Sequence, residues 1–491
     1  MKKYILAIDA GTSSSRALLF DHQGNTVALE QEEFTQYFPH QGWVEHDANE
    51  IWDTQLRVLQ RLLQNSGVSP EEIAAVGITN QRETTVVWDR KTGTPVGKAI
   101  VWQDRRTADF CEHLQQQGKA PLFYKKTGLV LDAYFSGTKI RWILNSKPEI
   151  RTAAEKGTLA FGTIDSWLIW KLTQGKVHVT DATNASRTLL FNIHTQKWDD
   201  ELLDLLEVPK SLLAKVVDSS EVVGTTAEEL LGAALPIAGI AGDQQAALFG
   251  QLCTAPGTVK NTYGTGCFCI MNTGKTPVVS KNKMLTTIAY RLQGEVTYAI
   301  EGSVFIAGAL VQWLRDQMQL IESAAEIETL AETVTDNGGL TFVPALSGLG
   351  APHWNPHATG ALMGITRGTS KGHIARAALE AIALRTREII IAMQKDAGVT
   401  FESLKVDGGA STNNLLIQLQ ADVLNTTVIR PKNTETTALG VAFFAGLAVG
   451  FWDSLEELTE RWEYERTFQP NPTTDVENIL QLWNKRITAL P

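Results

Sequence analysis

Near its start the chain reads Tyr4-Ile5-Leu6-Ala7-Ile8-Asp9-Ala10-Gly11-Thr12-Ser13-Ser14-Ser15-Arg16-Ala17-Leu18-Leu19-Phe20-Asp21, two apolar runs joined by a hydroxyl-rich turn. The runs have strand length, so the stretch predicts a β-hairpin. Gly11 lets the backbone approach a ligand closely, and the tip would offer N–H groups and hydroxyls to a phosphate. Asp9, at the end of a buried strand, suits a Mg²⁺ that keeps several waters, and Arg16 can offset phosphate charge. The alternative is an ordinary hairpin with a polar turn.

Length and composition indicate a globular protein of more than one domain. The 491 residues are several times the usual domain size, so two large domains can each bury a core. Hydrophobic residues make up 43% and charged residues 20%, which excludes a largely disordered chain, and no apolar run is long enough for membrane insertion. The net charge of −10 argues against nucleic acid as a partner. The first residues lead directly into a predicted strand, so we expect no signal peptide.

The cysteines and histidines exclude several kinds of chemistry. Four cysteines in so long a chain do not form a disulfide framework, and Cys267 and Cys269 alternate along a strand rather than converging on a metal. The sequence contains neither a zinc-binding H-E-x-x-H nor a G-x-S-x-G serine elbow. We therefore expect a cytoplasmic protein that uses neither zinc nor a nucleophilic serine.

Polar clusters stand where predicted strands end or helices begin. A buried strand over 73–79 carries Asn80-Gln81-Arg82-Glu83 to its carboxyl end, where open α/β sheets bind ligands. Three more clusters follow, at 101–106, 134–138 and 181–187. Around them we expect a third strand after Gly24-Asn25, a helix over 49–65 with a capping box at Asp47–Glu50, a strand over 84–88, helices over 107–117, 139–145 and 165–173, and mostly helix and loop up to about 235.

The pattern at the start of the chain is repeated in its middle. Residues 236–247 again place an acid, Asp243, after an apolar strand and at the start of a helix. A second hairpin over 258–272 follows, with Tyr263-Gly264-Thr265-Gly266 at its tip. Two such hairpins predict an α/β protein of two domains with one topology, 1–250 and 251–491, facing each other across a cleft.

Small-residue turns also mark the second half. A helix over 303–318 would carry Gly308 and Gln312 on neighbouring turns. A strand over 404–407 opens through glycines onto a helix over 413–424, whose free N–H groups suit a nucleotide. The other expected elements are a Gly/Pro-rich loop over 338–352, helices over 372–394 and 436–450, and a polar helical segment over 453–491.

Four of these motifs resemble those of the FGGY carbohydrate kinases, most closely the members that phosphorylate glycerol, and the resemblance spans nearly the whole chain. It implies a pair of actin-like, ribonuclease-H-like domains. It also implies ATP-dependent phosphorylation of glycerol to sn-glycerol 3-phosphate by direct in-line transfer, in glycerol catabolism. The motifs are Ile78-Thr79-Asn80-Gln81-Arg82-Glu83-Thr84-Thr85, Trp102-Gln103-Asp104-Arg105-Arg106, Gly239-Ile240-Ala241-Gly242-Asp243-Gln244-Gln245 and Asn261-Thr262-Tyr263-Gly264-Thr265-Gly266-Cys267-Phe268.

The resemblance implies that glycerol lies between the domains, with polar side chains on its hydroxyls and aromatic side chains along its carbon atoms. Asp243 would be the general base that accepts the proton of the attacking hydroxyl. The glycerol site would consist of Arg82, Glu83, Tyr134, Asp243 and Gln244, with Trp102 and Phe268 as the aromatic members.

The resemblance also implies sites for ATP and Mg²⁺. The phosphates would lie between the two hairpins, and Asp9 and Asp243 would hold the metal through water. The nucleotide-binding residues would be Thr12, Ser13, Ser14, Arg16, Thr265 and Gly266 at the phosphates, and Gly308, Gln312, Gly409, Ala410 and Asn413 along the adenosine.

Some positions depart from the family pattern. Ala10 stands where most of the compared relatives have glutamine, and Ser13 where they have threonine. In the loop 224–236, Ala234 occupies the position at which enterobacterial relatives use an arginine to bind fructose 1,6-bisphosphate, and the region lacks the histidine that some Gram-positive relatives phosphorylate. We therefore expect neither kind of control. Because relatives are commonly oligomeric, we expect a homodimer or homotetramer.

Each site residue also has a purely structural alternative. Arg82 and Glu83 could form a surface ion pair, and Asp243 could only cap a helix. Core packing would account for Trp102, a helix staple for Tyr134, and helix packing for Gly308 and Gln312. Two other functions remain open: a kinase of the same family acting on xylulose, ribulose or gluconate, and a non-catalytic nucleotide-dependent sensor.

Overall fold

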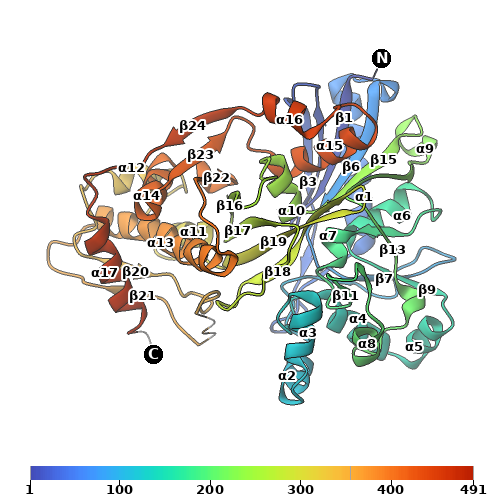
Figure 1. Ribbon diagram of the computed structural model, residues 1–491, viewed down its shortest axis with the longest axis horizontal. Helices are drawn as coiled ribbons and strands as arrows, with labels where there is room; N and C mark the ends of the chain where they lie inside the picture. The colour runs from blue at the N-terminus through green and yellow to red at the C-terminus, as the bar shows by residue number, and fades with distance from the viewer. Residues whose placement is uncertain (1, 354, 356, 490–491) are drawn as a thin grey trace.

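A computed structural model describes residues 2–353, 355 and 357–489, and two large mixed sheets form its centre (Figure 1). In the first sheet the three-stranded N-terminal meander lies beside two parallel strands. In order across the sheet, its strands are β14 (Ser220–Thr225), β15 (Pro236–Gly242), β6 (Ile73–Asn80), β1 (Tyr4–Ala10), β2 (Ser14–Phe20) and β3 (Thr26–Glu33).

The predicted first hairpin is confirmed, and both faces of its sheet are buried. Asp9 on β1 lies opposite Arg16 on β2. Along β1, Leu6 and Ile8 pack toward α1 and α6, whereas Ile5 and Ala7 pack toward α10 and α15. Two buried faces explain why β1 is a continuous apolar run rather than an alternating one.

The second sheet repeats the topology of the first. Both contain a three-stranded antiparallel unit, β3-β2-β1 or β19-β17-β16, extended by two parallel strands, β6-β15 or β22-β23. The predicted duplication of one α/β topology is therefore confirmed. In order, the strands of the second sheet are β18 (Leu285–Leu292), β19 (Glu295–Val304), β17 (Cys267–Gly274), β16 (Val259–Tyr263), β22 (Ser403–Asp407), β23 (Thr427–Pro431) and β24 (Tyr464–Phe468).

Two helices at equivalent positions of the repeat cross at close range. α10 (Asp243–Gly250) follows β15, and α15 (Thr436–Ala448) follows β23. A Cβ added to Gly440 would lie 1.8 Å from the carbonyl oxygen of Ala246, and one added to Gly250 would lie 2.0 Å from that of Thr436. In Figure 1, the red helix α15 lies against the blue strands of the first sheet. The predicted domain boundary at 250/251 stays a prediction. The helix α15 lies after this boundary in the sequence but packs against strands that lie before it.

The helix α1 (Ala48–Ser66) forms as predicted, but without the predicted capping box. Asp47 accepts hydrogen bonds from the N–H groups of Asn49 and Glu50. The Glu50 carboxylate instead accepts from the backbone N–H of Thr35 at 2.8 Å and from its hydroxyl at 2.7 Å. The acid therefore joins the helix to the segment that follows β3.

Several expected elements are wrong in detail. Residues 182–185 form a short helix within the expected polar loop. Residues 102–235 are mostly helix and loop, as predicted, and also contain six short strands. Residues 303–304 end β19, so the helix expected from 303 begins at Gly308. The C-terminal segment, expected to be helical, contains the edge strand β24. Four of its five side chains are exposed, so the sequence shows no apolar alternation, and its pairing with β23 makes it a strand.

The remaining described elements cover the two sheets or form smaller ones. No helix among the described residues is long and apolar enough to cross a membrane. The small sheets are β4 (Gln36–Tyr37), β5 (Glu45–His46) and β8 (Ala99–Ile100); β7 (Val86–Asp89) and β9 (Leu159–Gly162); β10 (Val179–Asp181) and β13 (Lys215–Val217); β11 (Phe191–Asn192) and β12 (Lys197–Trp198); and β20 (Thr341–Val343) and β21 (Ala361–Met363). The other α-helices are α2 (Ala108–Gln116), α3 (Ala120–Thr127), α4 (Ser136–Asn145), α5 (Pro148–Glu155), α6 (Ile164–Leu172), α7 (Ala182–Ala185), α8 (Asp200–Leu205), α9 (Glu228–Leu231), α11 (Gly308–Asp316), α12 (Glu326–Ala331), α13 (Lys371–Ala397), α14 (Asn414–Leu424), α16 (Leu455–Arg461) and α17 (Val476–Ile487), and three 3₁₀ turns lie at Pro70–Glu72, Lys210–Leu212 and Gly409–Thr412.

The crossing of α10 and α15 predicts a large effect of one methyl group. We expect Gly440→Ala to lower the free energy of unfolding by about 3 kcal/mol, because the two backbones must separate to admit the Cβ. Chemical denaturation measures the change. Gly97→Ala is the matched control, since no atom lies within 4 Å of the added Cβ there. Equal effects of the two substitutions would contradict the predicted close crossing.

Candidate active site

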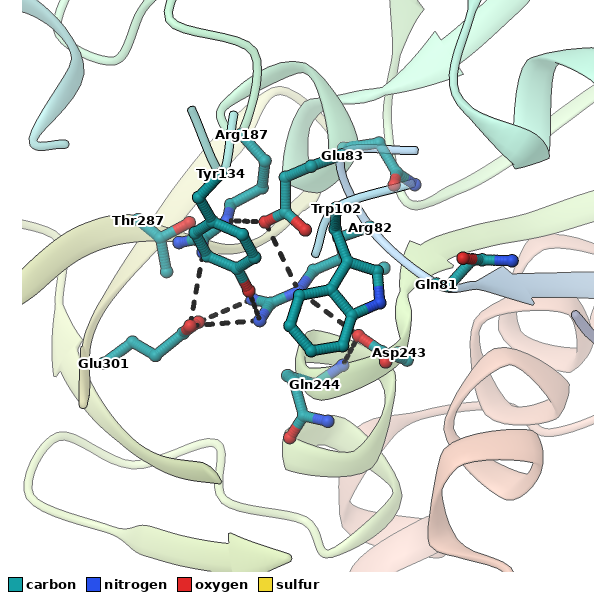
Figure 2. Close-up of polar contacts among 12 residues, drawn as sticks. Gln81, Arg82, Glu83, Trp102, Tyr134, Arg187, Asp243, Gln244, Thr287 and Glu301 are labelled. Atoms are coloured by element: carbon teal, nitrogen blue, oxygen red, sulfur yellow. Dashed lines mark hydrogen bonds and ion pairs between the residues drawn. The ribbon is translucent and has the colours of Figure 1, made fainter. Parts of the chain in front are cut away.

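The parallel strands β6 and β15 bring three predicted site residues to one edge of the first sheet. Arg82 and Glu83 follow the end of β6, and Asp243 follows the end of β15 as the first residue of α10. Trp102 and Tyr134 reach the same place from loops, and Figure 2 shows the five side chains gathered there. Arg82 and Glu83 are almost completely buried, so the alternative of a surface ion pair is wrong.

The Arg82 guanidinium is the centre of the site. Its two terminal nitrogens donate to the two oxygens of Glu301, Nη1 to Oε2 at 2.5 Å and Nη2 to Oε1 at 3.0 Å. Its Nε lies 3.2 Å from Oδ1 of Asp243. Longer contacts join Nη1 to Oε1 of Gln245 at 3.3 Å and Nη2 to the Tyr134 hydroxyl at 3.5 Å. Such a fork fixes the plane of the guanidinium.

A second arginine completes the buried network. Arg187, just after α7, donates from Nε to Oε1 of Glu83 at 2.6 Å and from Nη2 to Oε1 of Glu301 at 3.2 Å. Burial alone would raise the pKa of Glu301, but Arg187 and Arg82 outweigh it and hold that pKa at about 2. For Glu83 burial prevails over the same two arginines and raises the pKa. Glu83 also has a φ of 61°, an uncommon conformation for a residue with a side chain.

Asp243 is the accessible member of this cluster. Its side chain is 33% exposed, whereas that of Arg82 is 2% exposed. Besides the contact with Arg82, its Oδ1 accepts the backbone N–H of Gln244 at 2.7 Å. The N-cap of α10 is Gly242, so the alternative that Asp243 caps this helix is wrong. The Gln244 side chain is held by Lys260 of β16. Asp243 thus offers a fixed carboxylate on the open side of a buried ion network.

The aromatic residues connect this cluster to the first hairpin. Trp102 is half-buried, and its Nε1 donates to the Thr12 hydroxyl at 3.0 Å. Its ring meets that of Tyr134 edge-on, with centroids 5.6 Å apart. The carbonyl of Tyr134 accepts from Lys139 Nζ at 2.5 Å. Phe268 is half-buried on β17, and it takes no part in the hydrogen bonds and ion pairs of Arg82, Arg187 and Asp243.

The two acids predicted for metal binding suit one small cation. The pKa of Asp9 is raised to about 6, chiefly by burial, against the pull of Arg16, and the nearby carboxylates of Asp243 and Glu435 contribute to the rise. Asp9 and Asp243 are therefore close enough to repel each other, a situation that a divalent cation relieves. Two carboxylates fit a Mg²⁺ that keeps its waters. The described residues contain no group of three or more His, Cys, Asp or Glu that could hold a metal.

The tip of the first hairpin is held by hydrogen bonds from neighbouring side chains. Gln81 donates from Nε2 to the Gly11 carbonyl at 3.0 Å, and the same nitrogen lies 3.4 Å from Nδ1 of the buried His46. Thr12 is half-buried and Ser13 exposed at the tip, whereas the buried Ser14 hydroxyl accepts from Gln31 at 3.2 Å. Ala10 is fully buried, and nothing in the structure explains why it replaces glutamine.

The second hairpin meets two of the predicted glycine turns. The Gly308 N–H donates to the Gly264 carbonyl at 3.0 Å, and a Cβ on Gly308 would lie 2.5 Å from that oxygen. The carbonyl of Thr265 accepts from Ala307 and Ala309, which anchors the tip beside Gly266 to the start of α11. Gly308 therefore packs closely against the hairpin, while Gln312 is exposed one turn further on, and the predicted nucleotide contacts of both stay predictions.

The turn after β22 also contacts this hairpin, because a Cβ on Gly408 would lie 2.6 Å from the Tyr263 carbonyl oxygen. Gly409 next to it has open space and Ala410 is half-buried. The Asn413 side chain accepts from the Leu416 N–H at 2.8 Å and so caps α14. The structure therefore brings the tip and the 408–413 turn together, without testing their predicted contacts with a nucleotide.

Sequence reasoning missed the residues that orient the site. Glu301 was detectable as a single charge in the apolar strand Tyr298-Ala299-Ile300-Glu301-Gly302, and Arg187 ends a cluster already recognised as polar. No local signal indicates Lys139 or Glu435. Glu435, just before α15, forms an ion pair with Arg16.

Comparison with known proteins agrees with this geometry. The N-terminal domain of the FGGY family of carbohydrate kinases matches residues 4–250, and the C-terminal domain matches residues 259–449. A glycerol kinase from Deinococcus radiodurans is 59% identical over 486 residues, 99% of this chain and 97% of the relative. The crystal structure of Plasmodium falciparum glycerol kinase with ADP aligns with a TM-score of 0.93 at 35% identity, covering 99% and 97% of the two chains.

A gluconate kinase structure from Lactobacillus acidophilus aligns with a TM-score of 0.89 at 24% identity, covering 99% of this chain and 97% of its own, which shows the shared fold alone. Fold and site together define a two-domain α/β kinase. The chain belongs to the FGGY family of carbohydrate kinases, as its motifs predicted.

The buried His46 predicts a pH dependence of stability. Burial lowers its pKa to about 4, against about 6.5 in an unfolded chain. A depressed histidine pKa means that the unfolded state takes up the proton first, so this contribution to stability is present above pH 6.5 and is lost between about pH 6.5 and 4. We expect the free energy of unfolding to fall less between pH 7 and 4 in His46→Leu than in the wild type, by about 3 kcal/mol.

Denaturation at several pH values measures this difference. His113→Leu is the control, because His113 is exposed on α2, and it should follow the wild-type pH dependence. If the His46 and His113 variants gave the same curve, the predicted burial of a neutral imidazole would be wrong.

Proposed function

We propose that this chain phosphorylates glycerol with ATP to give sn-glycerol 3-phosphate, in glycerol catabolism. The observation that carries the proposal is the half-open carboxylate of Asp243, held by Arg82 beside Tyr134 and Trp102. A small triol needs donors, acceptors and an apolar wall within a few ångströms, and this cluster supplies all three. Relatives at 59% identity, named glycerol kinases, support the choice of substrate.

In the proposed mechanism Asp243 accepts the proton of the attacking hydroxyl through its exposed oxygen while Arg82 and Gln244 hold the carboxylate in place. Arg82, Glu83, Tyr134 and Gln244 would bind glycerol hydroxyls, and Trp102 and Phe268 would cover the carbon atoms. A substrate without one hydroxyl would leave a buried polar group unpaired, which is the basis of selectivity. Direct in-line transfer then asks mainly for positioning and charge stabilisation.

The nucleotide would lie between the two hairpin tips. Thr12, Ser13, Ser14 and Arg16 would face it from the first hairpin and Thr265 and Gly266 from the second, with the turns around Gly308 and Gly409 along the adenosine. Asp9 and Asp243 would hold Mg²⁺, which neutralises phosphate charge when bound. Domain closure would exclude water from the site. A homodimer or homotetramer, and the lack of fructose 1,6-bisphosphate control suggested by Ala234, stay predictions.

A steady-state assay across polyols and ketoses tests the substrate. We expect kcat/KM with glycerol to exceed that with xylulose, ribulose or gluconate, and release of ADP to depend on glycerol. Turnover of xylulose at the same rate would favour the sugar-kinase alternative. Binding of ATP without any glycerol-dependent ADP release would favour the non-catalytic sensor.

The role of Asp243 predicts a separation of binding from chemistry. Asp243→Asn should retain glycerol binding while kcat falls by about 10³-fold, because an amide cannot accept the proton. Calorimetry with glycerol and single-turnover kinetics measure the two effects. Asp109→Asn, on the exposed surface of α2, is the control for loss of one carboxylate. Near-normal turnover of the Asp243 variant would remove it from the role of base.

A further inference from the structure

Glu301 is an ionised residue in the interior of the second sheet. It lies on β19, paired with Ile270 of β17 on one side and Leu285 of β18 on the other. Its side chain is completely buried. Charged groups are seldom placed on a central strand, because removal from water costs several kcal/mol unless a partner compensates. Its partners therefore explain its presence.

Both partners come from the first half of the chain. Arg82 is 219 positions away in sequence and Arg187 is 114 positions away. Figure 2 shows the Glu301 carboxylate reaching both guanidinium groups from the side opposite Asp243. Ser186, which precedes Arg187 in the chain, also lies in hydrogen-bond contact with β18, because its hydroxyl is 3.1 Å from the hydroxyl of Thr287. The site of the first half is thus braced by two strands of the second sheet.

The fork between Glu301 and Arg82 determines which edge of the guanidinium remains available. With Nη1 and Nη2 on the two oxygens of Glu301, the Nε edge faces Asp243 at 3.2 Å. Without the fork, the guanidinium could rotate and take Asp243 or Glu83 as a bidentate partner instead. A bidentate contact with Asp243 would occupy both oxygens of the proposed base.

We propose that Glu301 is a positioning residue for the polyol: it holds Arg82 and Arg187 in the orientation that leaves an oxygen of Asp243 free for the substrate hydroxyl. The inference rests on the proposed function of the site and assigns Glu301 no contact with substrate. It requires the loss of Glu301 to weaken the use of polyol much more than the use of ATP, because the other contacts of the Arg82 guanidinium are with Glu83, Tyr134, Asp243 and Gln245 rather than with a hairpin tip.

Two substitutions and one matched control test the role. Glu301→Gln keeps the size and removes the charge, while Glu301→Asp keeps the charge and withdraws the carboxylate by one methylene. Glu388→Gln on α13 is the control, since Glu388 is also a mostly buried partner of an arginine, Arg385, and its other partners, His353 and Trp483, lie outside the site.

We expect KM for glycerol to rise about 10- to 100-fold in Glu301→Gln, while KM for ATP changes less than about threefold. Glu301→Asp should recover part of the loss. Glu388→Gln should leave the KM values for glycerol and for ATP unchanged, even if it lowers the melting temperature as much as Glu301→Gln does. Equal changes of the two KM values in Glu301→Gln, or a fall in activity that merely follows the folded fraction, would overturn the proposal. Should Glu301→Gln fail to fold, the same split is required of Glu301→Asp.

A crystal structure of the folded Glu301 variant separates this proposal from the proposed function. We expect the Arg82 guanidinium to turn toward Asp243 or Glu83, and an unmoved Arg82 would overturn the positioning role. Wild-type protein that did not phosphorylate glycerol would refute the proposed function, and the position of Arg82 in the variant would still decide the role of Glu301.

Discussion

The bidentate pairing of Arg82 with Glu301 is the interaction on which the site depends. Two arginines and three carboxylates lie within one cluster, and each would be costly to bury alone. The cluster is stable because each of these five groups has an oppositely charged partner at 3.2 Å or less. The three acids of the cluster also differ in environment. Both arginines lower the pKa of Glu301, burial raises the pKa of Glu83, and Asp243 alone is partly open to water.

The duplicated topology explains why such a cluster forms where it does. In each sheet the parallel strands end at the edge beyond which the chain turns into a helix, α10 after β15 and α15 after β23. The glycines Gly250 and Gly440 allow these two helices to cross almost backbone to backbone. The two halves also meet where α7 packs against β18, and beside that contact Glu301 of β19 reaches Arg82 at the strand ends of the first sheet.

The sequence predicted the single strands, turns and site residues of this arrangement better than it predicted which distant residues contact them. Both hairpins, the burial of 73–79 and the position of Asp243 follow from apolar runs and glycine turns, which act over a few residues. Arg82 was recognised as a site residue, but Glu301, 219 positions later, carries no local sign of its partner. The edge strand β24 was missed for a similar reason, since pairing with β23 rather than its own exposed side chains makes it a strand.

The cluster also limits how a polyol can be bound. In the described structure the donors of Arg82 face Glu301, Asp243, Gln245 and Tyr134. A hydroxyl that accepts from Arg82 has to displace one of them, and charge-assisted forks are the strongest of these contacts. The Tyr134 hydroxyl, at 3.5 Å, is the weakest. The loop that carries Tyr134 is fixed through its carbonyl by the buried Lys139, and it is therefore where the proposed polyol site would meet the ion network.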